Sequence, residues 1–286
     1  MIAMSSQGIL LIDKPEGITS RQVDNHFQHL FHTRKVGHLG TLDPFATGLL
    51  IVAVNEATKY MNFLPDEEKT YHARLVLGKA TDSGDKTGQV IEEKPVPSLS
   101  EENVNKVFKS FLGKGSQIPP MTSAIKVDGT ALYKLAHQGK EIDREPRPIE
   151  IFKLDLLELK EGEILFSCRV SKGTYIRVLG EDIAKALGTV GYLESLRRTA
   201  VGNVEIEQAI PLEKASEINL LDPADYVEYP NIEVNDEVAK KVSNGVKLSF
   251  DCDDERILIR HEGKALAVYE KQGEIYRCLR GLSSWK

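Results

Sequence analysis

Hydrophobic and polar positions along the first two thirds of the chain predict many strands and few helices. Apolar runs or apolar/polar alternation predict strands at 8–14, 49–54, 71–77, 89–92, 149–159 and 164–170. Helices are predicted at about 20–31, 101–112 and 178–187, and Thr19 or Ser20 and Ser100 supply N-caps for the first two. Because the helices interrupt the strands irregularly, the pattern favours a mixed α/β or α+β fold over repeated βαβ units.

The last third of the chain changes character. The acidic stretch 210–230 is punctuated by prolines, and we expect it to lead away from the main body. Beyond it, the pattern predicts a helix at 235–243 and short strands at 256–261, 264–271 and 274–279, with glycine turns between the strands. The sequence therefore predicts a large domain over 1–230 and a small β-rich domain over 231–286.

A segment inside the large domain breaks the strand pattern. Residues 115–148 are rich in Gly, Pro and basic side chains, and they predict a short hairpin and a short helix carried on an insertion.

Charge is distributed unevenly along the chain. The net charge is −6, yet residues 205–237 hold ten acidic side chains and one lysine, so the rest of the chain sums to +3. Residues 256–286 hold seven Lys or Arg against three Glu. Because binding depends on the field at one face rather than on the total, this acidic protein remains compatible with a nucleic-acid partner.

Composition narrows the class of protein. With 41% hydrophobic and 28% charged residues among 286, the chain is typical of globular proteins. Apolar runs fall short of the roughly 20 residues that span a bilayer, so we expect no membrane association. Cys168, Cys252 and Cys278 are odd in number and widely spaced, which fits free thiols in a reducing compartment. These features, with an N-terminus that lacks a secretory pattern, predict a cytoplasmic protein. We expect a monomer because no apolar helix is left over.

Four histidines within one window raise the possibility of a metal site: His26, His29, His32 and His38. Three of them advance by three along a predicted helix, so they drift around it, and no HExxH or CxxC motif completes a ligand set. We therefore expect no metal. A phosphate loop and a dinucleotide-binding GxGxxG motif are also missing from the sequence.

The stretch GHLGTLDPFATG at 37–48 holds the candidate catalytic residue, Asp43. Taken alone, Leu42-Asp43-Pro44 favours a turn or a helix cap, in which Asp accepts backbone N–H bonds. Other segments change this interpretation. In 171–177, Tyr175 and Arg177 lie two residues apart, on one side of an extended chain, where Arg177 can pair with a buried carboxylate.

Seven motifs in order resemble the TruB family of tRNA pseudouridine synthases. They span most of residues 8–200 and are G-x-x-x-x-D-K-P-x-G-x-T-S at 8–20, K-V-G-H-x-G-x-L-D-P-x-A-T-G at 35–48, E-A-T-K at 56–59, P-P-x-x-S-A-x-K at 119–126, L-Y-x-x-A-x-x-G at 132–139, S-K-G-T-Y-I-R at 171–177 and L-R-R at 196–198. The tail resembles the family's small RNA-binding PUA domain in strand pattern and charge.

The resemblance implies a fold and a reaction. The fold is the pseudouridine synthase fold, α+β with a central, mainly antiparallel mixed sheet flanked by helices, followed by the PUA-like domain at 231–286. The expected partner is tRNA, gripped partly by the insertion at 115–148. The expected reaction isomerises uridine-55 of the T-loop to pseudouridine, and it needs no cofactor because no atoms or electrons come from outside.

The resemblance also assigns roles to individual residues. Asp43 is the expected nucleophile, Arg177 keeps it ionised and aimed, and Tyr71 lies against the extruded uracil. The expected substrate-binding residues are His38, which fills the stacking position the base leaves, together with Tyr175, Leu196, Lys14 and Lys126. Glycines 37, 40 and 48 are expected to let the loop bend and RNA approach. Thr122 departs from the pattern, because many relatives have an aromatic residue there.

Two alternatives belong to other classes. An RNA-binding protein without chemistry would use Asp43 only as a turn cap. A nucleoside or glycoside hydrolase needs a second carboxylate near the first, and the nearest acids in sequence, Asp24 and Glu56, lie on flanking elements.

Overall fold

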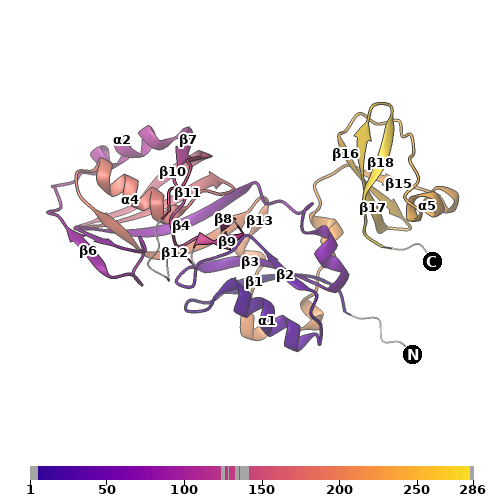
Figure 1. Ribbon diagram of the computed structural model, residues 1–286, viewed down its shortest axis with the longest axis horizontal. Helices are drawn as coiled ribbons and strands as arrows, with labels where there is room; N and C mark the ends of the chain where they lie inside the picture. Colours follow the sequence, from indigo (N-terminus) through magenta and orange to yellow (C-terminus); the bar gives the residue numbers. More distant parts are fainter. Residues whose placement is uncertain (1–5, 124–125, 128, 133–134, 136–141, 284–286) are drawn as a thin grey trace.

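A ten-stranded mixed sheet forms the main body of the computed structural model, which describes residues 6–123, 126–127, 129–132, 135 and 142–283 (Figure 1). Its main path runs β14-β1-β3-β12-β4-β11-β10-β7, with β2 paired to β3 and β13 paired to β12. Most neighbours are antiparallel, whereas β1–β14 and β3–β12 are parallel. The strands are β1 (Gly8–Lys14), β2 (Val36–Leu39), β3 (Thr47–Val54), β4 (Glu68–Leu77), β7 (Gly113–Gln117), β10 (Arg147–Lys160), β11 (Glu163–Ser171), β12 (Gly191–Val201), β13 (Val204–Glu205) and β14 (Ile210–Pro211). The predicted mixed, mainly antiparallel sheet is confirmed.

Among the described residues, three helices flank this sheet: α1 (Ser20–Leu30), α2 (Glu101–Phe111) and α4 (Ile176–Ala186). Thr19 caps α1 in a capping box with Gln22, and Ser100 caps α2 through the backbone N–H of Asn103. Helix α1 buries its apolar stripe against β1 and β3, whereas α2 and α4 cover the core of β4, β10, β11 and β12. All three lie where the pattern predicts them.

Strand β12 was not predicted, although it lies between β3 and β4 in the middle of the sheet. Two register shifts, at Leu193/Ser195 and Arg198/Ala200, interrupt its pairing with β4. Its central position also buries Arg198 completely. Bulges and a buried charge remove the apolar/polar alternation on which a strand prediction depends.

The acidic stretch does not lead away from the main body, which corrects the expectation for 210–230. β14 extends the sheet beside β1, and Leu221 exchanges two backbone hydrogen bonds of 2.9 Å with Ile9. Ala215 is buried in the core under α1. The apolar residues between the acids seat this segment on the edge of β1, while the carboxylates face water. The stretch contains the short 3₁₀ turns η3 (Leu212–Lys214), η4 (Glu217–Asn219) and η5 (Pro223–Tyr226), and η2 (Ile206–Gln208) precedes it.

The C-terminal residues build a second, four-stranded sheet in the order β15-β16-β17-β18, set apart at one end of the molecule (Figure 1). Its core includes Tyr269 and Tyr276, both fully buried. A further apolar cluster joins Leu258 and Val268 of this unit to Phe63 of the main body. Its elements are β15 (Asn231–Glu233), α5 (Asp236–Ser243), β16 (Arg256–His261), β17 (Lys264–Gln272) and β18 (Ile275–Gly281). The predicted helix and strands are confirmed.

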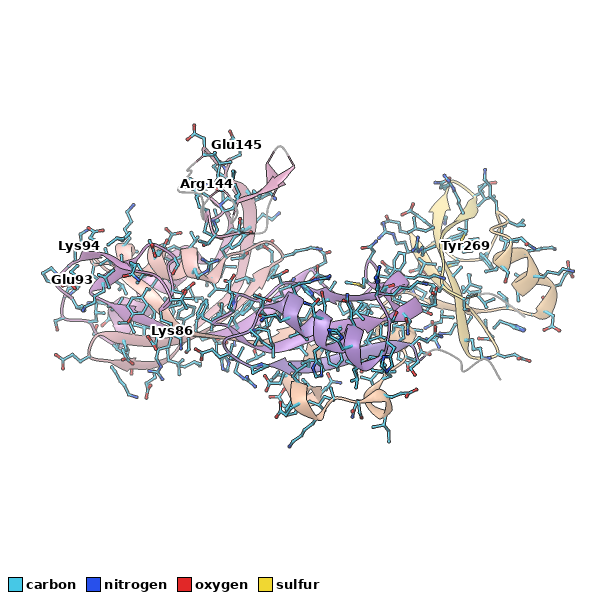
Figure 2. All side chains as sticks on the ribbon, turned by 60° about the horizontal axis from the view of Figure 1, so that its bottom comes forward. Lys86, Glu93, Lys94, Arg144, Glu145 and Tyr269 are labelled. Carbon is cyan, nitrogen blue, oxygen red and sulfur yellow. The ribbon has the colours of Figure 1, made fainter. Side chains whose placement is uncertain are left out.

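The described part of the insertion projects from the body, with Arg144 and Glu145 at its outer part (Figure 2). Its predicted hairpin is formed by β8 (Lys126–Val127) and β9 (Thr130–Ala131), whereas the predicted short helix falls largely outside the described residues. The remaining elements are η1 (Asn55–Tyr60) and the hairpin of β5 (Lys79–Thr81) with β6 (Val90–Glu93). Within the described residues, no helix has the length and hydropathy needed to cross a membrane.

Candidate active site

The loop that carries Asp43 connects the antiparallel neighbours β2 and β3. Helix α1 holds this loop through its first residue, Ser20. The hydroxyl of Ser20 accepts from the backbone N–H of Leu42 at 2.9 Å and donates to its carbonyl at 3.1 Å. The carbonyl of Pro44 accepts from the N–H of Gly17 at 2.8 Å. Because its backbone is held at three points, the loop presents the Asp43 side chain from a defined position.

Glycine 48 has a structural reason that differs from the expected approach of RNA. Its φ is +103°, and a Cβ there would lie 2.2 Å from the carbonyl oxygen of Arg198. Any side chain would force β3 and β12 apart, so Gly48 allows these strands to pair at the base of the loop.

The carboxylate of Asp43 forms an ion pair with Arg177, whose Nε donates to Oδ2 at 2.9 Å. Arg177 lies in the first turn of α4 and is only 4% exposed. Its Nη1 donates to the carbonyl of Ser83 at 2.7 Å and to the hydroxyl of Thr122 at 2.5 Å, and its Nη2 donates to the carbonyl of Thr122 at 3.1 Å. Because all three of its nitrogens donate hydrogen bonds, the guanidinium is held in one orientation. Thr122, the departure from the family pattern, holds Arg177 in place.

A second carboxylate, Asp85, lies behind this pair and was missed in the sequence. It is 4% exposed, and its Oδ2 lies 3.8 Å from the Nε of Arg177. Its Oδ1 accepts from the hydroxyl of Ser83 at 2.9 Å and from the N–H and hydroxyl of Thr87 at 2.9 and 2.5 Å. These hydrogen bonds within its own turn fix Oδ1, and they leave Oδ2 facing Arg177. Asp85 therefore supports the guanidinium of Arg177. The polar spacing S-x-D-x-T at 83–87 is the feature of the sequence that could have indicated this carboxylate.

Opposing influences act on the pKa of Asp43. Burial raises it above the usual value for a carboxyl, the charge of Arg177 lowers it, and the neighbouring Asp85 raises it. Arg177 thus opposes the cost of holding a carboxylate ion in this environment.

Lys14 lies under the loop and is completely buried. Its ammonium donates to the carbonyls of Pro15 and Ile18, each at 2.8 Å, and to that of Pro44 at 3.4 Å. Burial lowers its pKa to about 8, and the charge of Asp43 acts in the opposite direction. In this position Lys14 braces the loop, and its contact with substrate stays a prediction.

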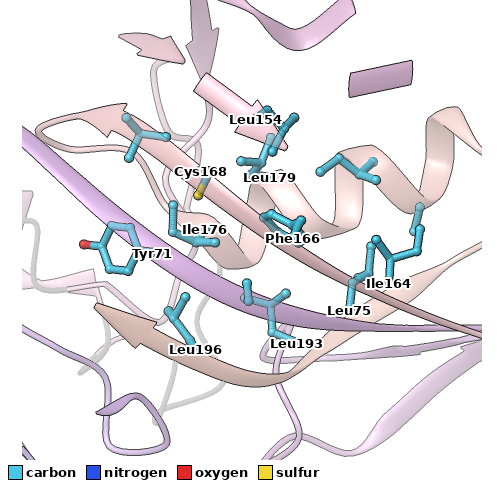
Figure 3. Packing of buried hydrophobic residues seen from close by; sticks show 14 of the residues in the cluster. Tyr71, Leu75, Leu154, Ile164, Phe166, Cys168, Ile176, Leu179, Leu193 and Leu196 are labelled. Carbon is cyan, nitrogen blue, oxygen red and sulfur yellow. The ribbon is translucent and has the colours of Figure 1, made fainter. Parts of the chain in front are cut away.

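Asp43 lines a pocket of about 350 Å³ whose walls combine aromatic and apolar side chains with polar and charged ones. Tyr71 from β4 and Leu196 from β12 line it at the end of the apolar core, and the Tyr71 hydroxyl points away from that core (Figure 3). Tyr175 contributes from the start of α4, where its backbone N–H donates to the side chain of Gln117 at 2.7 Å. Asp43, Tyr71, Arg177, Tyr175 and Leu196, five of the eight candidate residues, therefore meet at one pocket.

Arg198, the last residue of the L-R-R motif, organises this pocket. Its Nε donates to the carbonyl of Leu49 at 2.7 Å and its Nη2 to that of Gly40 at 2.8 Å, which joins β3 to the start of the loop. It pairs with Tyr71 across the sheet. Burial raises the pKa of Tyr71, and the charge of Arg198 opposes that rise.

A second pocket of about 550 Å³ adjoins the first and is lined in part by His38. Asp43, Arg177 and Thr122 line both pockets, so the carboxylate stands at the boundary between them. The Nδ1 of His38 lies 3.0 Å from the carboxylate of Asp24, and its Nε2 lies 3.2 Å from the hydroxyl of Thr41. Lys126 lies in β8 of the insertion, and its substrate contact stays a prediction.

The other histidines of the window are His26, His29 and His32, which are all exposed. Among the described residues, no three His, Cys, Asp or Glu side chains are grouped so that they could hold a metal ion.

Comparison with known families agrees with this geometry. A model described as "TruB family pseudouridylate synthase (N terminal domain)" matches residues 28–176, more than half of the chain. This chain belongs to the TruB family. The family predicted from the seven motifs is thereby confirmed, and so is the enzyme class, an isomerase that forms pseudouridine.

Individual TruB relatives are named tRNA pseudouridine synthase B. The protein of Lactobacillus acidophilus is 38% identical over 287 residues, which cover 94% of this chain and 96% of that protein. The protein of Syntrophotalea carbinolica is 42% identical over 255 residues, which cover 85% and 82%. The protein of Psychrobacter cryohalolentis is 47% identical over 210 residues, which cover 72% of this chain and 58% of that longer protein, less than two thirds of its length.

Solved structures share the TruB-family fold at low identity. A chain in the crystal structure of a Cbf5-Nop10-Gar1 complex superposes with a TM-score of 0.74 at 22% identity, covering 99% of this chain and 88% of that one. A chain in an H/ACA RNP bound to a substrate RNA containing 2′-deoxyuridine gives a TM-score of 0.72 at 21% identity, covering 98% and 86%. The predicted pseudouridine synthase fold is confirmed.

Proposed function

We propose that this enzyme converts uridine-55 in the T-loop of tRNA to pseudouridine, with Asp43 as its single nucleophile and without a cofactor. The observation that carries the proposal is the Asp43–Arg177 ion pair at the boundary of the two pockets, one of them walled by Tyr71 and Leu196. The name of the relatives, tRNA pseudouridine synthase B, supports tRNA as the substrate.

The chemistry requires one activated carboxylate. Asp43 adds to C1′ of the ribose or to C6 of the base, and the bond between C1′ and N1 breaks. The uracil turns within the pocket, C5 bonds to C1′, and the bond between Asp43 and the substrate breaks, which regenerates the carboxylate. The proton that C5 loses is balanced by the one that N1 gains. Atoms and electrons are conserved. Arg177 keeps the carboxylate ionised and aimed, and Tyr71 lies where it can pack against the base.

One pocket can bind the extruded base, and His38 in the other can occupy the stacking position that the base leaves. Extrusion from a folded loop costs a few kcal/mol, which the enzyme must offset by binding the base and filling the gap. His38 lines one of the two adjoining pockets, and Tyr71 lines the other. We infer that RNA lies over the His38 pocket and that the base passes Asp43 into the Tyr71 pocket.

We further propose that residues 1–230 form the catalytic domain and 231–286 a PUA-like RNA-binding domain, in a monomer that acts in the cytoplasm. The support is the separate C-terminal sheet with its own core and the net positive charge of residues 256–286.

Release of tritium from C5 of uracil in a tRNA transcript tests the function. A pseudouridine synthase releases tritium to water while the base stays attached to the RNA. A hydrolase releases labelled uracil instead, and a binding protein releases neither. The proposal requires tritium release without free uracil, and either other result contradicts it.

Variants of His38 test its role as a filler of the stack. His38→Phe and His38→Gln should keep substantial activity, whereas His38→Ala should lose about tenfold more, because the volume and face of the ring stabilise the extruded state. Single-turnover rates at saturating enzyme measure this without interference from binding. Proton transfer by this histidine typically contributes about 10²–10⁴-fold, so equal losses of that size in all three variants would contradict the filling role.

Charges of the C-terminal sheet test its contact with RNA. Arg277 and Arg280 are exposed on β18. Arg277→Gln and Arg280→Gln should each reduce the slope of log affinity against log salt by somewhat under one unit, with little change in the single-turnover rate. Lys214→Gln, an exposed lysine of the acidic segment, is the matched control. Unchanged slopes in both arginine variants would show that β18 does not contact phosphates.

A further inference from the structure

Helix α1 buries a carboxylate that the proposed mechanism does not use. Asp24 is 2% exposed, although its neighbours Val23 and Phe27 pack into the apolar core below α1. Both of its oxygens lie 3.0 Å from the Nδ1 of His38. Arg21 also lies near Asp24, at 3.5 Å, but its side chain is 65% exposed. A buried carboxylate is costly unless it is bonded, so the contact with His38 gives Asp24 its main compensation.

This contact determines which nitrogen of His38 carries a proton. An ionised carboxylate only accepts hydrogen bonds, so the Nδ1 of His38 must be the donor. In the neutral ring the Nε2 then has a lone pair, and it accepts from the hydroxyl of Thr41 at 3.2 Å. The imidazole is thus held at both of its nitrogens, one from α1 and one from its own loop.

The backbone of His38 adds a third constraint. His38 lies in β2, five residues before Asp43, and its backbone pairs with Val52 of β3. Its side chain is 17% exposed and lines the pocket that Asp43 shares. A ring in this position, held by strand, helix and loop, is ordered before any RNA arrives.

We propose that Asp24 is a positioning residue for His38: it fixes the imidazole in the Nδ1-protonated tautomer and in one orientation, ready to occupy the stack that the extruded base leaves. The use of the ring on RNA rests on the proposed function, whereas its tautomer and orientation are properties of the free protein. A side chain ordered in advance does not have to be immobilised during extrusion, an effect worth up to about tenfold in rate.

The tautomer is tested first, on the free protein. Nitrogen-15 NMR of histidine-labelled protein, at a pH where the imidazole is neutral, should show the His38 proton on Nδ1. Asp24→Leu should shift it toward Nε2, while Asp24→Asn, whose amide oxygen also accepts, should keep it on Nδ1. A wild-type ring protonated on Nε2 overturns the proposal. This measurement needs no RNA, so its result does not depend on whether the proposed function holds.

Kinetics then show whether Asp24 acts through His38. In single turnover on a tRNA transcript at saturating enzyme, Asp24→Leu should lower the rate about tenfold, and Asp24→Asn should restore most of it. Asn25→Leu adds the same side chain at an exposed position of α1 and is the control, expected to match the wild type. In a His38→Phe background, Asp24→Leu should cause no further loss. An equal loss in both backgrounds would mean that Asp24 supports the helix rather than the ring, which overturns the proposal.

Discussion

Asp43→Asn should abolish pseudouridine formation, with a loss on the order of 10⁴-fold or more, and leave tRNA affinity within about twofold of the wild type. The amide keeps the shape of the side chain but cannot form the covalent bond that the reaction needs. Binding survives because it is spread over many phosphate contacts. The variant should also fold, because burial raises the pKa of Asp43 and a neutral side chain avoids the cost of the buried charge.

Tritium release and filter binding, measured on the same preparations, check this prediction. Asp155→Asn is the matched control, because Asp155 pairs with Lys153 on the surface of β10, away from both pockets. Turnover of Asp43→Asn near the wild-type rate would remove Asp43 as the nucleophile. A parallel loss of binding would instead show that this carboxylate organises the RNA interface.

Arg177→Met should lower the single-turnover rate by about 10²–10³-fold and move its acid limb to higher pH. The nucleophile must be ionised, so activity falls as the pH drops through the pKa of Asp43. Burial already raises that pKa, and the charge of Arg177 is the largest influence that lowers it. Removing the guanidinium therefore raises the pKa further, and activity begins to fall at a higher pH than in the wild type.

Arg177→Lys separates charge from geometry. Lysine keeps the positive charge, so the acid limb should stay near that of the wild type, but it cannot reproduce the fork that bonds Asp43, Ser83 and Thr122 together. The rate at the optimum should therefore remain low. If the acid limb of Arg177→Met coincided with that of the wild type, the ion pair would not control the ionisation of the nucleophile.

The hydrophobic pattern predicted helices and strands correctly where one face of the element is buried and the other is exposed to solvent. Helices α1 and α2 could be placed by their caps, and β4 by its alternation. Strand β12 could not, because its bulges and the buried Arg198 respond to neighbours on both sides rather than to its own periodicity. The prediction for the acidic segment at 210–230 was wrong for a related reason. Its charge indicated an exposed segment that leaves the main body, but its few apolar residues pack on that body and decide where it lies.

The sequence predicted the site residues that belong to motifs with reactive side chains. It did not predict the residues that reach the site only through tertiary contacts. Asp43, Tyr71 and Arg177 stood out by residue type and resemblance, and the structure brings them to one pocket. Asp85 and Thr122 support Arg177 from segments that lie 92 and 55 residues away in the chain, and no local pattern announces such contacts. Asp24 was considered only as a possible second catalytic acid, because its partner His38 becomes adjacent only when α1 packs beside β2.

The most direct test of the account is to locate the product at nucleotide resolution. A full-length tRNA transcript should gain one pseudouridine, at position 55, in a single turnover with wild-type enzyme. It should gain none with Asp43→Asn, and a transcript with cytidine at 55 should stay unmodified. Pseudouridine at another position, or product formed at 55 by Asp43→Asn, would contradict it.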